Sequence, residues 1–268
     1  MDERVLENLN STPLYNHRGG SSVYQKVVVG QPLNSIYGYQ YKGAIQYTYE
    51  YMQNYNTKMK QQDATWTPAK YEAWINEQLA AGATFPIVVD ADGHVVMNGN
   101  SPQRLTYWYG DTSYDFQGGD AFYEDVNHDG TINELDMVYL GNSRPKLQGG
   151  FSLTLQYGNW KFVSRFTYRY GAKIVNTARM NLESMYGTEN QCSSVTYRWR
   201  KDGDVTMMPR ALWNAGYNYQ MSSRYVEDGS FLRFQNIQIS YNFPKKQIKK
   251  WGLSNLQAYV TMNRLFTF

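Results

Sequence analysis

Residues 150–170 read GFSLTLQYGNWKFVSRFTYRY, and this stretch decides the fold. Apolar and polar residues alternate on both sides of the tight-turn pair Gly158-Asn159, which predicts an antiparallel hairpin. In the second strand three cations share one face and aromatic residues the other: Lys161, Arg165 and Arg169 against Phe162, Phe166, Tyr168 and Tyr170. A cationic face is unfavourable in a soluble sandwich core and is typical of a strand that lines the lumen of a membrane barrel.

Two further strands are predicted at 230–243 and 255–268, each of 14 residues. They are longer than ordinary strands and fit tilted membrane strands. The segment between them, PKKQIKKWG from 244 to 252, has four lysines. We interpret it as a solvated turn at a membrane edge, with nucleic acid or anionic lipid as the alternatives.

The connections between the predicted strands alternate in length. Their order is long, short, long, short: 43–148, 158–159, 181–228 and 244–254. Outer-membrane barrels alternate long extracellular loops with short periplasmic turns in the same way. We therefore predict an all-β fold, a segment of an antiparallel transmembrane β-barrel with long extracellular loops.

The composition supports a sheet with one face exposed to water and one apolar face. Aromatic residues make up 16% of the chain, yet its mean hydropathy is −0.63. A tyrosine-rich soluble β-sandwich remains an alternative. The net charge of +3 argues against a nucleic-acid partner. The chain has no run of 18 apolar residues, so the sequence predicts no transmembrane helix. The first residues, Met1-Asp2-Glu3-Arg4, do not begin a signal peptide, so an exported chain would be mature or truncated.

The predicted organisation has three parts. Residues 1–42 hold a barrel strand (23–29) and the start of an extracellular loop. Residues 43–148 form a folded insertion, with a helix at 67–81 capped by Thr67 and a hairpin around 90–93. The alternate tyrosines of 36–51 predict extended backbone there. Residues 149–268 are C-terminal barrel strands.

Residues 125–136, DVNHDGTINELD, carry the one motif with defined chemistry. Oxygen-bearing side chains stand at positions one, three and five of a calcium loop, glycine supplies the sharp turn at six, and position twelve is Asp where an EF-hand has Glu. The predicted ligands are Asp125, Asn127, Asp129, Thr131 (through its carbonyl) and Asp136. We predict a structural calcium ion; the alternative is an acidic turn without metal.

Catalytic signals are weak. The histidines His17, His94 and His128 are scattered, Cys192 is the single cysteine, and no hydrolase or phosphate-binding motif occurs. A glycoside hydrolase would need two facing carboxylates in a cleft. We expect no enzyme activity and no catalytic residues.

Three segments together resemble a known family: VGQPLNSIYGYQYKGAIQ (29–46), GDAFYEDVNHDGTINELDMVYLGNSRPKLQGGFSLTLQYGNWKF (119–162) and DGSFLRFQNIQISYNFPKKQIKKWGLSNLQAYVTMNRLFTF (228–268). They are similar to the C-terminal barrel region of SusC/RagA-type TonB-dependent outer-membrane transporters of Bacteroidetes. The resemblance leaves out 47–118 and 181–227, and the first of these looks like an individual extracellular elaboration.

The resemblance implies a 22-strand barrel with an N-terminal plug in a Gram-negative outer membrane. It implies import of glycans or peptides with a SusD-like surface lipoprotein, and energy from TonB. The chain shows neither the plug nor the closing strand of that pattern, so we expect a part that does not fold or transport alone. The competing hypothesis is a soluble, calcium-stabilised carbohydrate-binding β-domain.

Overall fold

The computed structural model describes residues 14–16, 25–27, 32–109, 112–213 and 217–268. The chain divides into two compact units. The first comprises Met1–Leu140 with Val175–Val226, and the second Gly141–Ile174 with Glu227–Phe268. No helix of the described residues is both long enough and apolar enough to cross a membrane.

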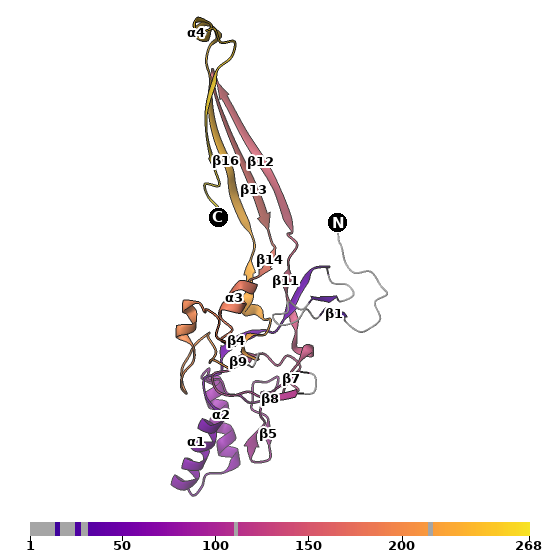
Figure 1. Ribbon diagram of the computed structural model, residues 1–268. Helices are drawn as coiled ribbons and strands as arrows, with labels where there is room; N and C mark the ends of the chain where they lie inside the picture. Colours follow the sequence, from indigo (N-terminus) through magenta and orange to yellow (C-terminus); the bar gives the residue numbers. More distant parts are fainter. Residues whose placement is uncertain (1–13, 17–24, 28–31, 110–111, 214–216) are drawn as a thin grey trace. The chain divides into compact units, whose positions relative to one another are not determined.

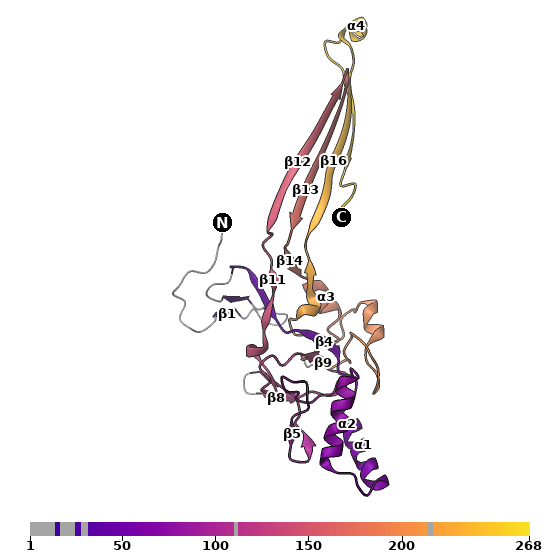
Figure 2. The ribbon, with the colours of Figure 1, turned by 180° about the vertical axis from the view of Figure 1, so that it is seen from behind.

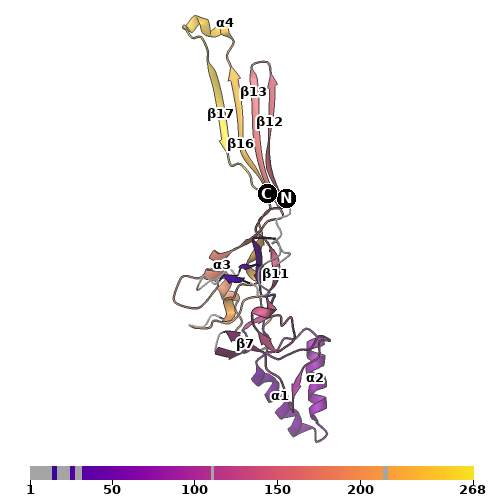
Figure 3. The same cartoon turned by 90° about the vertical axis from the view of Figure 1, so that its right-hand side faces the viewer.

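The second unit is built on one four-stranded antiparallel sheet (Figure 3). Its strands are β12 (Leu147–Tyr157), β13 (Trp160–Tyr170), β16 (Phe231–Asn242) and β17 (Gln257–Asn263), paired in that order. A helical turn, α4 (Lys245–Ile248) with η5 (Lys249–Trp251), joins β16 to β17. The prediction that these segments pair as antiparallel neighbours in chain order is confirmed.

The alternation of residues in 150–170 places apolar side chains on one face of this sheet. Phe151 stacks on Phe166 with ring centroids 4.5 Å apart, and Phe166 packs on Phe234 of β16 at 4.3 Å. These cross-strand aromatic pairs stabilise the register. Phe151 is nevertheless 53% exposed and Leu155 56% exposed, so the face has an apolar surface open to its surroundings.

The sheet has one irregularity, between β13 and β16. The register shifts between Arg165 and Phe166, which leaves Gln235 of β16 as the additional residue of a bulge. Beyond β17, Arg264 has a positive φ of 54°, and its amide donates to the Gln235 carbonyl at 3.0 Å. Pairing resumes at Phe266, whose carbonyl accepts the Phe234 amide at 3.0 Å, and continues at Phe268, whose amide and carbonyl bond Leu232. The predicted strand 255–268 is therefore interrupted.

The first unit contains short strands around a tyrosine-rich core (Figure 1). Two-stranded antiparallel pairs join β1 (Leu14–Asn16) to β2 (Gln25–Val27), β4 (Tyr41–Ala44) to β9 (Ala121–Tyr123) and β5 (Met97–Asn98) to β6 (Ser101–Pro102). β3 (Ser35–Gly38) pairs with β11 (Val138–Asn142), and β7 (Thr106–Tyr109) lies between β8 (Thr112–Asp115) and β10 (Thr131–Ile132). A further pair, β14 (Lys173–Val175) with β15 (Val226–Asp228), belongs mostly to the second unit. The predicted strand 23–29 is present at 25–27; its remaining residues lie outside the described ones.

Two helices, α1 (Tyr49–Gln62) and α2 (Pro68–Ala80), lie side by side (Figure 2). α2 confirms the predicted helix, because Thr67 accepts a hydrogen bond from the Lys70 amide and Pro68 opens the first turn. The helices and the 85–97 hairpin share a second core. That hairpin is also as predicted, since Val89 bridges Val95 around the Asp90–Gly93 turn.

The prediction of extended backbone through residue 51 was wrong, since α1 begins at Tyr49. Thr48 caps this helix through the Tyr51 amide, and the Asp202 carboxylate holds Thr48 by two hydrogen bonds of 2.6 and 3.1 Å. Met52 and Asn56, four residues apart, are then both buried, and Met52 belongs to the second core. A distant carboxylate and this helical spacing outweighed the alternation of tyrosines.

The predicted loop 181–228 is mostly irregular but contributes to the core. It contains short helices: α3 (Thr177–Leu182), which begins before it, then η2 (Ser193–Tyr197), η3 (Tyr217–Tyr219) and η4 (Ser223–Tyr225). Met221 and Tyr225 are buried, as are Met185, Val195 and Met208 in a small cluster of their own. This segment is therefore a packed part of the first unit.

Candidate functional site

The predicted calcium loop follows β9 and contains β10 and the 3₁₀ turn η1 (Glu134–Asp136). Thr131 and Ile132 pair in parallel with Thr106 and Tyr107 of β7. The loop is thus fixed at its start and at its middle, and all five predicted ligands lie on it.

Hydrogen bonds within the loop draw its oxygens together. The Gly130 amide donates to Asp125 Oδ2 at 2.8 Å, and the Thr131 amide donates to Asp129 Oδ1 at 2.8 Å. Asn127 Nδ2 donates to Asp129 Oδ2, also at 2.8 Å. Gly130 has φ +84°, a left-handed conformation that glycine adopts without strain.

Asp136 closes the loop. It is fully buried, and its two oxygens accept the Val126 amide at 2.9 Å and the Asn133 amide at 2.8 Å. Burial raises the pKa of Asp136 and the nearby Asp125 charge adds to the rise, while the backbone donors oppose it. The position-twelve carboxylate therefore joins the two ends of the loop through backbone hydrogen bonds.

The donor set fits a hard cation, because it consists of carboxylate, amide and carbonyl oxygens. Asp125 Oδ1 is buried and accepts no hydrogen bond from the described residues, which leaves it free to act as a ligand. Among the described residues no group of three or more His, Cys, Asp or Glu side chains could hold a metal ion. A calcium site here would thus need Asn127 and the Thr131 carbonyl as well.

A second candidate lies on the polar face of the four-stranded sheet. A shallow hollow of about 280 Å³ is lined by Ser152, Thr154, Lys161, Val163, Arg165, Gln238, Ser240 and Gln257. The predicted placement of Lys161 and Arg165 on the polar face is borne out, and no acidic residue lines the hollow. Arg169 donates to the Ser143 carbonyl at 2.9 Å instead.

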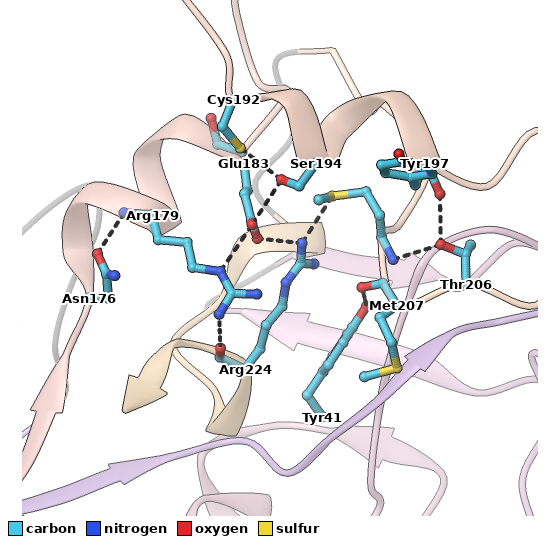
Figure 4. Close-up of polar contacts among 12 residues, drawn as sticks. Tyr41, Asn176, Arg179, Glu183, Cys192, Ser194, Tyr197, Thr206, Met207 and Arg224 are labelled. Carbon is cyan, nitrogen blue, oxygen red and sulfur yellow. Dashed lines mark hydrogen bonds and ion pairs between the residues drawn. The ribbon is translucent and has the colours of Figure 1, made fainter. Parts of the chain in front are cut away.

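A buried ion-pair cluster that the sequence did not indicate holds the 177–225 segment (Figure 4). Arg224 Nη2 lies 2.6 Å from Glu183 Oε2, and Arg179 Nε lies 3.0 Å from Oε1. Ser194 Oγ also donates to Oε1, at 3.0 Å. The Arg224 guanidinium lies 5.3 Å from the ring centroid of Tyr41, so the cluster ties this segment to β4.

The charges in this cluster shift several pKa values. Burial alone raises the pKa of Glu183, but the hydrogen bond from Arg179 and the charge of Arg224 outweigh burial and hold it below its ordinary value. Burial raises the pKa of Tyr225 to about 12 although Arg224 opposes it. The cluster is therefore one of ionised Glu183 and Arg224 with neutral tyrosines, a structural arrangement.

A second buried pair fixes the same segment further along. Asp120 is fully buried and accepts from Arg210 Nε and from the Tyr114 hydroxyl, both at 2.6 Å. Asn218 Nδ2 donates to Asp120 Oδ1 at 3.3 Å. Arg210 and Asn218 are thus attached to the segment between β8 and β9.

The described histidines do not form a catalytic pair. His94 and His128 are exposed, and His128 Nδ1 lies 3.0 Å from the Val89 carbonyl. Cys192 Sγ contacts Ser194 Oγ at 2.7 Å, and neither described histidine is its partner. His17 lies outside the described residues.

Comparison with known proteins gives relatives of one kind. Three TonB-dependent receptors of Formosa agariphila match: P26 at 30% identity over 71% of this chain, P3 at 30% over 65%, and P39 at 28% over 57%. The chain spans 20%, 16% and 15% of the lengths of these relatives, respectively. No protein-family model matches the chain.

Solved structures show the same fold. A chain of the RagAB peptide importer superposes in its open-open state with a TM-score of 0.56 at 14% identity, and in its closed-closed state with 0.54 at 16%. Each match covers 99% of this chain and 22% of the importer chain. The relatives are receptors and importers, which points to a role other than catalysis. In sequence and in fold, the chain therefore belongs with the TonB-dependent receptors of the SusC/RagA type.

Proposed function

We propose that this chain forms part of an outer-membrane importer for oligomeric nutrients, glycans or peptides. The observation that carries the proposal is the two-faced sheet of the second unit. Its apolar face is exposed at Phe151, Leu153 and Leu155, while its other face holds a polar hollow with Lys161 and Arg165. A strand pair with this division suits hydrocarbon on one side and a water-filled lumen on the other.

The alternative function, a soluble carbohydrate-binding domain, requires the apolar face to be covered. In a sandwich a second sheet would pack on it at about 10 Å. Leu153 and Val260 of this face are instead 46% and 62% exposed within the described part of the chain. Contiguous exposed apolar area of this kind favours a lipid-facing surface.

The proposed import function also implies partners for this chain. A SusD-like surface lipoprotein would work with the chain on the extracellular side, where the long segments 43–148 and 181–228 emerge. The structural similarity to a chain of the RagAB peptide importer supports a peptide or another oligomer as cargo. TonB would act through parts of the receptor outside this chain, in a Bacteroidetes-like outer membrane.

We also propose a structural calcium ion in the 125–136 loop. Asp125, Asn127, Asp129, the Thr131 carbonyl and Asp136 would hold it, and the unpartnered Asp125 Oδ1 supports this assignment. The ion would offset the negative charge of the carboxylates in this loop. Its role would be to keep the loop between β9 and β11 rigid.

The proposed import function is tested with the full-length product of the gene. A deletion strain should lose growth on the oligomeric nutrient that induces the gene and retain growth on the corresponding monomer. The protein should fractionate with the outer membrane and migrate faster on gels before heating than after. Recovery of the protein in the soluble fraction would favour the carbohydrate-binding domain instead.

A further inference from the structure

The second unit has an extreme charge bias. Residues 147–170 and 230–268 contain no Asp or Glu. They contain nine cationic residues: Lys161, Arg165, Arg169, Arg233, Lys245, Lys246, Lys249, Lys250 and Arg264. Four of these cations lie within one turn of six residues, between β16 and β17, which is the densest positive cluster in these segments.

This lysine turn, residues 244–252, has a defined conformation. Ile248 is buried and anchors the turn, and its carbonyl accepts the Leu253 amide at 3.3 Å. Gly252 ends the 3₁₀ turn with a positive φ of 69°. The four lysines around Ile248 are all exposed, so the turn presents their ammonium groups outward from a fixed base.

Aromatic residues lie at the same end of the sheet. The register aligns Tyr157, Trp160 and Tyr241 on adjacent strands, and Trp160 contacts Tyr241 with ring centroids 4.7 Å apart. Trp251 in the lysine turn is 65% exposed. Aromatic rings of this kind concentrate at the level of lipid headgroups, where their apolar body and polar edge are both accommodated.

We infer that the lysine turn binds the phosphate groups of anionic phospholipid in the leaflet facing the periplasm. The inference rests on the proposed membrane barrel, in which the short connections 158–159 and 244–256 lie on the periplasmic side. The aromatic row marks the headgroup level, and the lysines follow directly beyond it in the chain. Positive charge next to an aromatic row matches a lipid leaflet whose headgroups are negative and whose acyl chains beneath them are apolar.

A lipid surface explains the arrangement better than an acidic protein does. Trp251 and Leu253 are exposed beside the lysines, and a membrane offers phosphates and apolar chains within a few ångströms of each other. Ammonium groups on flexible stems suit mobile headgroups, since lysine acts as a point charge without fixed geometry. No acidic side chain of 230–268 is available to neutralise the four lysines.

The test measures lipid binding to the full-length protein purified in detergent. Native mass spectrometry with phosphatidylglycerol and phosphatidylethanolamine of the same acyl chains gives the two affinities side by side. We expect tighter binding of phosphatidylglycerol, and a loss of about five-fold in its affinity for each lysine removed. The quadruple variant Lys245→Gln, Lys246→Gln, Lys249→Gln, Lys250→Gln should bind both lipids equally.

A matched control removes the same charge elsewhere. Lys58→Gln with Lys60→Gln neutralises two exposed lysines of α1 and should leave the lipid preference unchanged, whereas Lys249→Gln with Lys250→Gln should lower it. Trp251→Ala tests the aromatic contribution without a change in charge, and should lower the affinity for both lipids. Heat-dependent gel migration of every variant verifies that the barrel has formed.

The outcomes separate this inference from the proposed function. A folded outer-membrane protein with no preference for phosphatidylglycerol overturns the lipid site and leaves the import function standing. A preference that persists in the quadruple variant overturns it as well. If the quadruple variant binds lipid normally yet imports poorly, the lysines contact an acidic periplasmic protein and the lipid assignment is wrong. A protein absent from the outer membrane overturns both.

Discussion

Arg224 and Glu183 form a buried ion pair, with Nη2 and Oε2 2.6 Å apart and side chains 5% and 3% exposed. They are 41 residues apart in the chain, so their pairing closes the irregular segment between α3 and η4 onto the core. A charge this deep is stable only while its partner remains, because desolvation of an unpaired ion is costly.

Replacing Glu183 by Gln should therefore destabilise the first unit strongly. Arg224 and Arg179 would keep their charges without a counter-ion, and loss of one partner of a buried pair costs about 3–5 kcal/mol. Thermal unfolding of the full-length protein in detergent measures the effect. Glu189→Gln, at an exposed position in the same segment, is the control. Equal melting temperatures for the two variants would show that the pair contributes little.

Acid should weaken the same contact. The pKa of Glu183 is held below its ordinary value of 4.5, so the unfolded chain binds the proton more readily than the folded one. The stabilisation is present above pH 4.5 and is lost as the pH falls through the lowered folded value. The free energy of unfolding should decrease as the pH is lowered from 6 to 3, and this decrease should be smaller in the Glu183→Gln variant than in the native protein. Parallel pH profiles for the two proteins would contradict this assignment.

Calcium should bind the 125–136 loop. Calorimetry on the full-length protein should detect binding that Asp125→Asn weakens and Asp129→Ala abolishes, because each removes a carboxylate oxygen from the proposed ligand set. Asp92→Ala, in the exposed turn of the 85–97 hairpin, should have no effect. If the native protein gives no heat of binding when calcium is added, the loop is an acidic turn held by its own hydrogen bonds.

The two faces of β12 should tolerate charge differently. Leu153→Lys places an ammonium on the proposed lipid face, where the cost is about 2–4 kcal/mol near the middle of the bilayer. Thr154→Lys places it in the polar hollow and should cost much less. The fraction of each variant that reaches the heat-modifiable form in the outer membrane compares them. A greater loss for Thr154→Lys would reverse the assignment of the faces.

The sequence alone determined the sheet of the second unit, and for a local reason. Side chains of a strand alternate between its faces, so the order of residues in 150–170 specifies both the faces and the register. The helix at Pro68 was equally readable, since Thr67 and Pro68 are local start signals. The acidic spacing of 125–136 brought its candidate ligands into one loop because they lie within twelve residues of each other.

Tertiary structure decided what depends on distant partners. α1 begins at Tyr49 because Asp202 holds Thr48 from 154 residues away, which no local pattern reveals. The pairing of Glu183 with Arg224 likewise joins residues whose own segments carry no periodic signal. Both contacts join residues that are far apart in the chain and meet only once the chain has folded. Their positions follow from the packed core rather than from neighbouring residues, and sequence periodicity therefore does not encode them.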